Sequence, residues 1–123
     1  MGIANKSKLK SKKEIALLFQ KGRWISYGSL RVISLKHPDV SNHKVGVSVS
    51  KRLFKKASDR NRIKRLLREA YRLNKPLFVE RFSNDSLTML FYVSQEFPKG
   101  YQQIEKDFIK LCSPKKINSI PKP

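Results

Sequence analysis

The sequence predicts an α+β domain in which helices pack on one β-sheet. Some segments repeat apolar residues at intervals of three and four, which is typical of helices, and others alternate or are rich in β-branched residues, which is typical of strands. Their order is helix, strand, strand, helix, strand, helix, with a short additional strand expected at residues 24–27. The length of 123 residues fits one domain with a modest core.

The compact domain is expected over residues 11–112, between two polar and basic ends. Residues 1–10 are predicted to form a flexible basic tail, and residues 113–123, with three prolines and three lysines, a second one. The single cysteine, Cys112, cannot form a disulfide within the chain. The first residues lack the apolar core of a signal peptide, and no apolar run approaches the length of a membrane span. These features predict a cytoplasmic protein.

The first helix is predicted at residues 12–21. Ser11 and Glu14 have the S-x-x-E spacing of a capping box, in which each side chain satisfies a free backbone N–H. Gly22 follows the helix at a position where a left-handed residue is common. The apolar face of this helix is formed by Ile15, Leu18 and Phe19.

Three strands are predicted after this helix. Residues 29–36 alternate and are rich in β-branched side chains. In residues 44–50 valines alternate with Gly46, Ser48 and Ser50, which predicts one packed face and one face of very small residues that another backbone can approach. Residues 86–94 are apolar enough for a central strand.

The chain is expected to turn between the first two long strands and to end in a helix. The turn is predicted at residues 38–42 and is flanked by His37 and His43. The last helix is predicted over residues 101–112. Its buried face is formed by Tyr101, Ile104, Phe108 and Leu111.

The strongest compositional signal is positive charge. The chain has 28 Lys and Arg against 9 Asp and Glu, which gives a formal net charge of +19. Like charges at this density repel one another in a compact domain, so the protein is expected to meet a polyanion that relieves the repulsion. Nucleic acid and an anionic membrane surface are the candidates.

The segment DRNRIKRLLREAYR, residues 59–72, predicts an amphipathic helix that carries much of this charge. Ser58 or Asp59 is expected to cap its N-terminus. On a helical wheel the apolar residues fall within an arc of roughly 120°. They are Ile63, Leu66, Leu67, Ala70 and Leu73. The remaining arc holds five arginines and one lysine, so a broad cationic face is expected in solvent.

A solvated helix surface is the simplest alternative for such a run of charge. A solvated helix commonly mixes signs through Glu–Lys pairs, however, and only Glu69 and Asp59 offset the cations here. Arginine also has a planar fork that suits phosphate oxygens, and the preceding segment SKRLFKK adds four more cations. The pattern therefore favours a surface that binds a polyanion.

Single-stranded nucleic acid also requires platforms on which bases stack. The aromatic residues available for this are Phe19, Trp24, Tyr27, Phe91 and Tyr92. For each of them an ordinary place in the core is the more common alternative.

The segment KVGVSVSKR, followed shortly by RNRIKRLLREAYR, resembles the protein subunit of bacterial ribonuclease P, and the similarity extends over residues 8–92. The resemblance implies an α–β sandwich with one mixed sheet packed by helices and a left-handed β-α-β crossover. It implies a protein that binds the catalytic RNA and the 5′ leader of precursor tRNA, while the RNA removes the leader with Mg²⁺ that it mainly holds itself. One protein is expected to pair with one RNA, without a membrane.

The resemblance also assigns roles to individual positions. The residues expected to contact the catalytic RNA are Lys51, Arg52, Arg60, Asn61, Arg62, Lys64, Arg65, Arg68 and Arg72. The residues expected to line a cleft for the leader are Ile15, Phe19, Arg31 and Ile33.

The residues themselves indicate no catalytic machinery. The nine carboxylates are scattered without a close pair for acid–base or two-metal chemistry. His37 and His43 resemble surface residues, and Cys112 has no Cys or His at metal-ligand spacing. A binding subunit that neutralises charge and positions a substrate needs none of these groups.

Three alternatives remain at this point. The first is another RNA- or DNA-binding structural protein of the ribosomal or nucleoid type. The second is a nuclease that acts without RNA. The third is a membrane-surface protein, which would need basic and aromatic residues on one helix, and the basic helix has no Trp or Phe.

Overall fold

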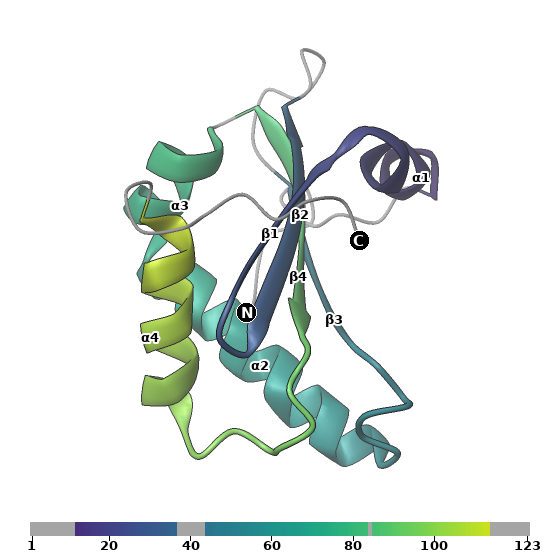
Figure 1. The fold of residues 1–123 in the computed structure, drawn as a ribbon, viewed down its shortest axis with the longest axis vertical. Helices are drawn as coiled ribbons and strands as arrows, with labels where there is room; N and C mark the ends of the chain where they lie inside the picture. Colours follow the sequence, from purple (N-terminus) through teal and green to yellow (C-terminus); the bar gives the residue numbers. More distant parts are fainter. Residues whose placement is uncertain (1–11, 37–43, 84, 114–123) are drawn as a thin grey trace.

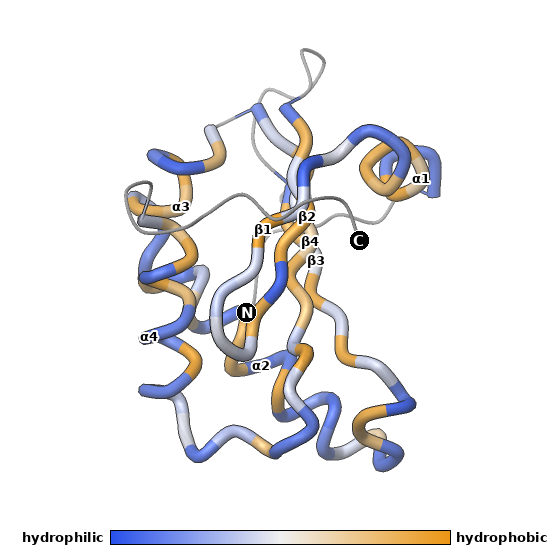
Figure 2. Tube along the Cα trace, viewed as in Figure 1, coloured by the Kyte–Doolittle hydropathy of each residue, from blue (hydrophilic) through white to orange (hydrophobic). Residues whose placement is uncertain are grey.

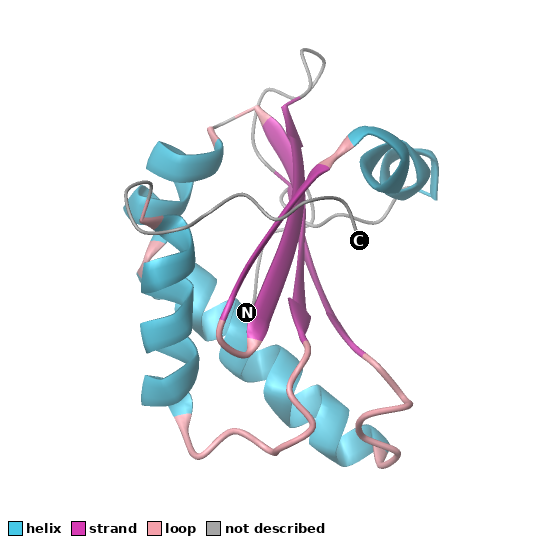
Figure 3. Ribbon diagram, in the orientation of Figure 1, coloured by secondary structure: helices cyan, strands magenta, loops and turns pink. Residues whose placement is uncertain are grey.

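The computed structural model describes residues 12–36, 44–83 and 85–113. These residues form four helices and four strands (Figure 1). In chain order the elements are α1 (Lys12–Lys21), β1 (Arg23–Tyr27), β2 (Leu30–Lys36), β3 (Lys44–Val49), α2 (Ala57–Leu73), α3 (Lys75–Phe82), β4 (Ser86–Tyr92) and α4 (Tyr101–Cys112). In Figure 3, α1 lies on one side of the sheet and α2, α3 and α4 lie on the other.

The four strands form one mixed sheet in the order β1-β2-β4-β3. β2 is antiparallel to both β1 and β4, whereas β3 and β4 are parallel neighbours. The chain passes from β3 to β4 through α2 and α3, which makes the β-α-β crossover that the resemblance implies. The predicted class, an α+β sandwich with one mixed sheet, is confirmed, and β4 is central as predicted.

Apolar side chains are buried on both faces of the sheet. Adjacent residues of β2 point to opposite faces, and both Val32 and Ile33 are fully buried. Val32 belongs to the larger core between the sheet and α2–α4, while Ile33 joins Leu18 and Leu87 in a smaller core beneath α1. Figure 2 accordingly shows hydrophobic residues along the strands and many hydrophilic residues along α2.

The face of small residues predicted for the strand at 44–50 is present in β3. Val45 and Val49 are buried in the larger core, whereas Gly46 and Ser48 pair with Met89 and Phe91 on the α1 side of the sheet. The side of β3 that faces α1 therefore carries little bulk.

The helix α3 was absent from the sequence prediction. It has only eight residues, and Pro76 lies in its first turn, where the missing N–H costs no hydrogen bond. Phe78 and Phe82, one turn apart, are its buried side chains. A segment this short gives little periodicity, so its helical state depends on the packing of these two rings.

The boundaries of α2 differ from the prediction at both ends. The helix begins at Ala57, and the capping position is Lys56, so neither Ser58 nor Asp59 acts as the predicted cap. Leu73, predicted to pack, is 51% exposed, and Tyr71 is buried in its place. The reason is the unpredicted α3, because Tyr71 packs edge-on against Phe78 with ring centroids 5.1 Å apart.

Gly22 is not left-handed as predicted, since Gly28 is the glycine with positive φ in the described part of the chain. Gly22 lies where β1 leaves α1, and its N–H donates to the Leu18 carbonyl at 2.7 Å. A Cβ atom there would lie 2.6 Å from Cγ1 of Ile33, so close approach explains the glycine. The predicted tails, Ser11 and the turn at 38–42 lie outside the described residues.

The turn between β1 and β2 is fastened to α4 by one carboxylate. Asp107 accepts hydrogen bonds from the backbone N–H of Ser29 at 3.0 Å and from its hydroxyl at 2.6 Å. Gly28 precedes this contact with φ 57°, and a Cβ there would approach the Asp107 carboxylate to 2.6 Å. The β1–β2 turn and α4 are thereby joined by a polar contact that admits no side chain between them.

We expect Asp107→Ala to lower the free energy of unfolding by about 2 kcal/mol, because the buried N–H of Ser29 loses a charged acceptor. Urea denaturation followed by circular dichroism measures the change. Lys106→Ala, at an exposed neighbouring position, is the control and should change stability by no more than about 0.5 kcal/mol. Equal stability of the two variants would contradict the assigned role of Asp107.

Candidate nucleic-acid interface

The helix α2 packs on the sheet by a narrow apolar stripe. Its buried residues are Ile63, Leu67, Ala70 and Tyr71. Each turn of the helix therefore commits about one side chain to the core and leaves the remainder directed outward. This packing explains how a segment with so many arginines can still be part of a folded domain.

The outward side of α2 gathers seven of the residues that are predicted to contact RNA. We call this set the cationic face. Its members are Arg60, Asn61, Arg62, Lys64, Arg65, Arg68 and Arg72. All of them are exposed except Arg60 and Lys64, which are partly buried. A hollow of about 530 Å³ at the start of the helix is lined by Ser58, Asn61, Arg62 and Arg65.

Lys51 and Arg52 lie just beyond β3, in the turn that leads to α2. Both side chains are exposed. The backbone N–H of Arg52 donates to the Ser50 hydroxyl at 3.0 Å, which fixes the start of this turn. The strand end and the helix start thus carry adjacent groups of positive charge.

Two arginines of the cationic face are engaged by their own chain. Nη1 of Arg60 donates to the carbonyl oxygens of Phe54 and Lys55 at 2.8 and 2.9 Å, which ties the loop before α2 to the helix. Arg72 forms an ion pair with Glu69 at 2.7 Å. That hydrogen bond lowers the pKa of the Glu69 carboxyl and raises the pKa of Arg72.

The other three arginines are available for a ligand. Within the described part of the chain, Arg62, Arg65 and Arg68 form no ion pair with a carboxylate. The guanidinium carbon of Arg62 lies 5.8 Å from the centre of the Phe97 ring, a cation–π distance that orients this side chain without neutralising it. The structure therefore separates the predicted RNA-binding residues into internally bonded and uncompensated cations.

A second surface of interest lies on the opposite side of the sheet, beside α1. Phe19, Trp24 and Phe91 form a cluster with ring centroids 5.6 to 6.0 Å apart. Phe19 is 45% exposed, and the guanidinium of Arg31 lies 5.9 Å from the centre of the Trp24 ring. We call these four residues the aromatic surface, which combines flat apolar groups with a positive charge.

The four residues predicted to line a leader cleft differ in how exposed they are. Phe19 and Arg31 belong to the aromatic surface, and Ile15 on α1 is partly buried against the smaller core. Ile33 is fully buried in the smaller core and lies beneath this surface. Trp24 and Phe91, which were not among the residues predicted for the cleft, are part of the aromatic surface.

Of the other two candidate aromatic platforms, Tyr92 is buried and donates its hydroxyl hydrogen to the Glu96 carbonyl at 2.7 Å. Tyr27 packs against the larger core. Both therefore have structural roles on the face away from α1.

The described residues hold no group of three His, Cys, Asp or Glu that could bind a metal ion. Burial raises the pKa of the Cys112 thiol to about 12, so the reactive thiolate is suppressed at neutral pH. None of the described helices is long and apolar enough to cross a bilayer. The two surfaces offer cations and rings, which are groups for binding.

Fold and surface together define a small, strongly basic α+β protein that presents its charge on one helix. The sequence model of the family described as Ribonuclease P matches residues 3–116. A ribonuclease P protein component from Porphyromonas gingivalis is 33% identical over 112 residues, which covers 85% of this chain and 80% of that protein. The chain belongs to the ribonuclease P protein family, the protein subunits of a ribonucleoprotein endoribonuclease that processes tRNA.

Solved structures show the same fold at lower sequence identity. The ribonuclease P protein of Staphylococcus aureus superposes with a TM-score of 0.72 at 20% identity, covering 85% of this chain and 91% of that one. The protein from Thermotoga maritima gives a TM-score of 0.72 at 20% identity and covers 85% and 94% of the two chains. Family membership implies partnership with the ribonuclease P RNA.

We expect Arg60→Ala to lower the free energy of unfolding by about 1 to 2 kcal/mol, since the carbonyls of Phe54 and Lys55 lose a charged donor. Arg62→Ala should change stability by less than about 0.5 kcal/mol, because its side chain is exposed. Thermal and urea unfolding of both variants measure the difference. If both variants were equally stable, Arg60 would not clamp this loop.

Proposed function

We propose that this protein binds the catalytic ribonuclease P RNA through the cationic face of α2. The proposal rests above all on the uncompensated guanidinium groups of Arg62, Arg65 and Arg68, which extend from the hollow at the helix start along its exposed side. Guanidinium groups bind phosphate oxygens through paired hydrogen bonds. Lys51 and Arg52 add phosphate contacts at the end of β3, and Asn61 and Lys64 support the same surface.

Arg60 and Arg72 have different roles in this proposal. The loop clamp made by Arg60 fixes the start of α2, so its contribution to RNA binding comes through the position of its neighbours. Arg72 has to share its charge with Glu69, which reduces its attraction for phosphate. The strongest RNA contacts are therefore assigned to the middle of the cationic face.

The aromatic surface is proposed to hold the unpaired 5′ leader of precursor tRNA. Stacking of a base on an aromatic side chain contributes about 1 to 3 kcal/mol and tolerates any sequence. Phe19 offers the most exposed ring of this surface, and Arg31 adds a charge for the backbone. Gly46 and Ser48 continue the same side of the sheet with little bulk, which leaves room for a nucleic-acid chain.

Hydrolysis of the leader is assigned to the RNA and its Mg²⁺. A Mg²⁺ ion prefers carboxylate and other oxygen ligands, whereas the cationic face presents guanidinium and ammonium groups that repel it. The cationic face is therefore poorly suited to hold a magnesium ion. The protein's contribution is to neutralise phosphate charge and position the leader, as one protein per RNA in the cytoplasm.

If the protein neutralises about six phosphates, the logarithm of its affinity for the RNA should fall with the logarithm of salt concentration at a slope of roughly −4 to −5. Arg62→Ala and Arg65→Ala should each flatten this slope by about one unit. Fluorescence anisotropy at several salt concentrations measures it. Arg72→Ala is the matched control and should have a smaller effect, because Glu69 already neutralises that guanidinium. Unchanged slopes for Arg62→Ala and Arg65→Ala would remove both from the interface.

Reconstitution with the host's ribonuclease P RNA at low Mg²⁺ tests the whole proposal. We expect this protein to stimulate removal of the leader, and affinity for precursor tRNA to rise as unpaired leader nucleotides are added. Phe19→Ala should weaken binding of long leaders by roughly 5- to 150-fold, equivalent to about 1 to 3 kcal/mol, and leave substrates without a leader unaffected.

Lys13→Ala is the control for the leader experiment, since Lys13 is exposed on the same helix outside the aromatic surface. Affinity that ignores leader length would instead indicate a structural RNA- or DNA-binding protein of the ribosomal or nucleoid type. Cleavage by the protein without RNA would indicate a nuclease and would contradict the proposal.

A further inference from the structure

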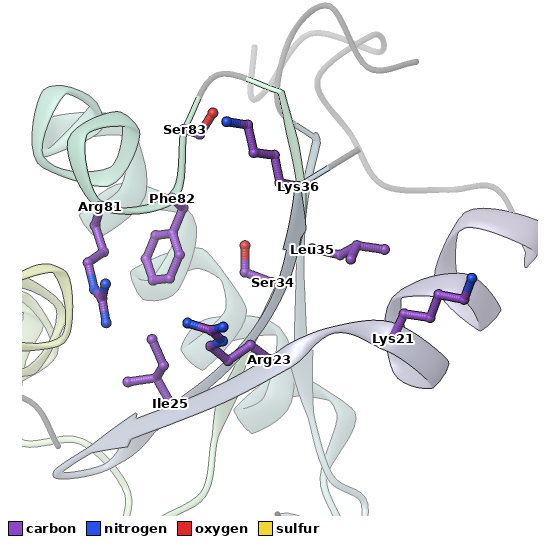
Figure 4. A pocket seen from close by; sticks show the side chains of 9 residues that line it. All are labelled: Lys21, Arg23, Ile25, Ser34, Leu35, Lys36, Arg81, Phe82 and Ser83. Carbon is purple, nitrogen blue, oxygen red and sulfur yellow. The ribbon is translucent and has the colours of Figure 1, made fainter. Parts of the chain in front are cut away.

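A third group of positive charges lies far from the start of α2. A pocket of about 380 Å³ opens where β1 begins and β2 ends, next to the end of α3 (Figure 4). Its cations come from separate elements: Arg23 from β1, Lys36 from β2 and Arg81 from α3. Lys21 at the end of α1 also borders the pocket, but its side chain points away from the space that Arg23 and Arg81 share. The fold therefore assembles this pocket from residues that are scattered over about half of the sequence.

The lining of this pocket contains no carboxylate to balance the cations. Lys21, Arg23, Lys36 and Arg81 form no ion pair within residues 12–36, 44–83 and 85–113. Asp85 accepts a hydrogen bond from the hydroxyl of Ser83 at the rim of the pocket. That hydrogen bond is the main cause that lowers the pKa of Asp85, and the charge of Lys36 is the smallest. Of all the acidic residues, only Asp39 lies outside the described ranges.

The side chain of Arg81 has a hydrogen-bond donor without an acceptor. Its Nε atom is buried and has no hydrogen-bond partner among the described residues. A buried donor without a partner is destabilising, and a charged one more so, which makes an anion the natural complement. Figure 4 shows the guanidinium groups of Arg23 and Arg81 directed into the same space, with the Phe82 ring beside them.

The backbone at the rim of the pocket is strained as well. Ser83 has φ 80° and ψ 159°, a region that is almost restricted to glycine. Strain of this kind persists where the surroundings hold it in place and is frequent where ligands bind. The turn of Ser83 ends α3 directly behind Arg81 and Phe82, so it sets the position of the pocket wall.

We propose that this pocket binds a phosphate group of the RNA backbone. Three cations without a carboxylate in the lining, one of them with a buried unpaired donor, fit a phosphate diester. A pocket of about 380 Å³ also has room for the sugar attached to that phosphate, which a site for a small free anion would not need. The inference rests on the proposed function, because it takes the ribonuclease P RNA as the partner.

The pocket and the start of the cationic face lie at opposite ends of the sheet. Arg23 and Ser34 are paired at the pocket end, whereas α2 follows Val49, which is paired with Tyr92 at the other end. Seven residues of β2 separate these ends by about 20 Å, at roughly 3.3 Å per residue. One phosphate cannot reach both places, so the pocket adds a contact that is independent of α2.

The test compares Arg23→Gln/Lys36→Gln with Lys106→Gln/Lys110→Gln. Both pairs remove two charges, and Lys106 and Lys110 lie on α4 outside the pocket lining. We expect the pocket variant to bind the RNA about five- to tenfold more weakly in physiological salt and to flatten the salt slope by about one unit. The control should stay within about twofold, and circular dichroism and Tm verify that both variants fold.

Arg62→Ala is measured in the same assay, alone and with the pocket variant. Because the two sites are far apart, their effects on affinity should multiply. If the pocket variant matched its control while Arg62→Ala still weakened binding, this inference would be overturned and the proposed function would stand. If substitutions at neither site affected RNA binding, both this inference and the proposed function would be overturned.

Inorganic phosphate distinguishes an RNA site from a site for a free anion. Phosphate should raise the Tm of the free protein, and the pocket variant should lose part of this increase. Loss of this effect together with normal RNA affinity would overturn the assignment to RNA. If the pocket variant loses both the phosphate effect on Tm and affinity for RNA, the assignment of the pocket to RNA is supported.

Discussion

Burial of the β2–β4 pair on both faces is the constraint on which the rest of this structure depends. Val32 and Leu90 are fully buried toward α2 and α4, while Ile33 and Leu87 are fully buried toward α1. Each such side chain contributes about 1.5 to 3 kcal/mol. Because helices cover both sides of the central strands, ligands have to bind on the outer sides of helices, beside α1 or at the ends of the sheet.

The few acidic residues are largely used inside the protein, and this leaves the positive charge uncompensated. Asp107 holds the β1–β2 turn, Glu14 pairs with Lys44 and Glu69 pairs with Arg72. Glu105 accepts hydrogen bonds from Tyr101 and Asn74. A polyanion that binds the remaining cations relieves their mutual repulsion and so stabilises the folded chain.

Sequence patterns predicted the elements that have long periodic segments. The strands, α1, α4 and the cationic side of α2 could be identified because alternation and helical periodicity are local properties. Tertiary contacts determined what was missed, including α3 with its two buried rings and the burial of Tyr71 in place of Leu73. The same limit applies to the site, since no local pattern reveals that Arg60 is clamped or that Arg23 and Arg81 share a pocket.

The crossover between β3 and β4 has a consequence for synthesis on the ribosome. β2 ends at Lys36, and its neighbour β4 begins roughly fifty residues later at Ser86. At about 5 to 20 residues per second, the nascent strand waits on the order of 3 to 10 s for this neighbour. During that interval its apolar side chains are unprotected outside the exit tunnel, so the order of translation makes β2 a natural segment for a chaperone to shield.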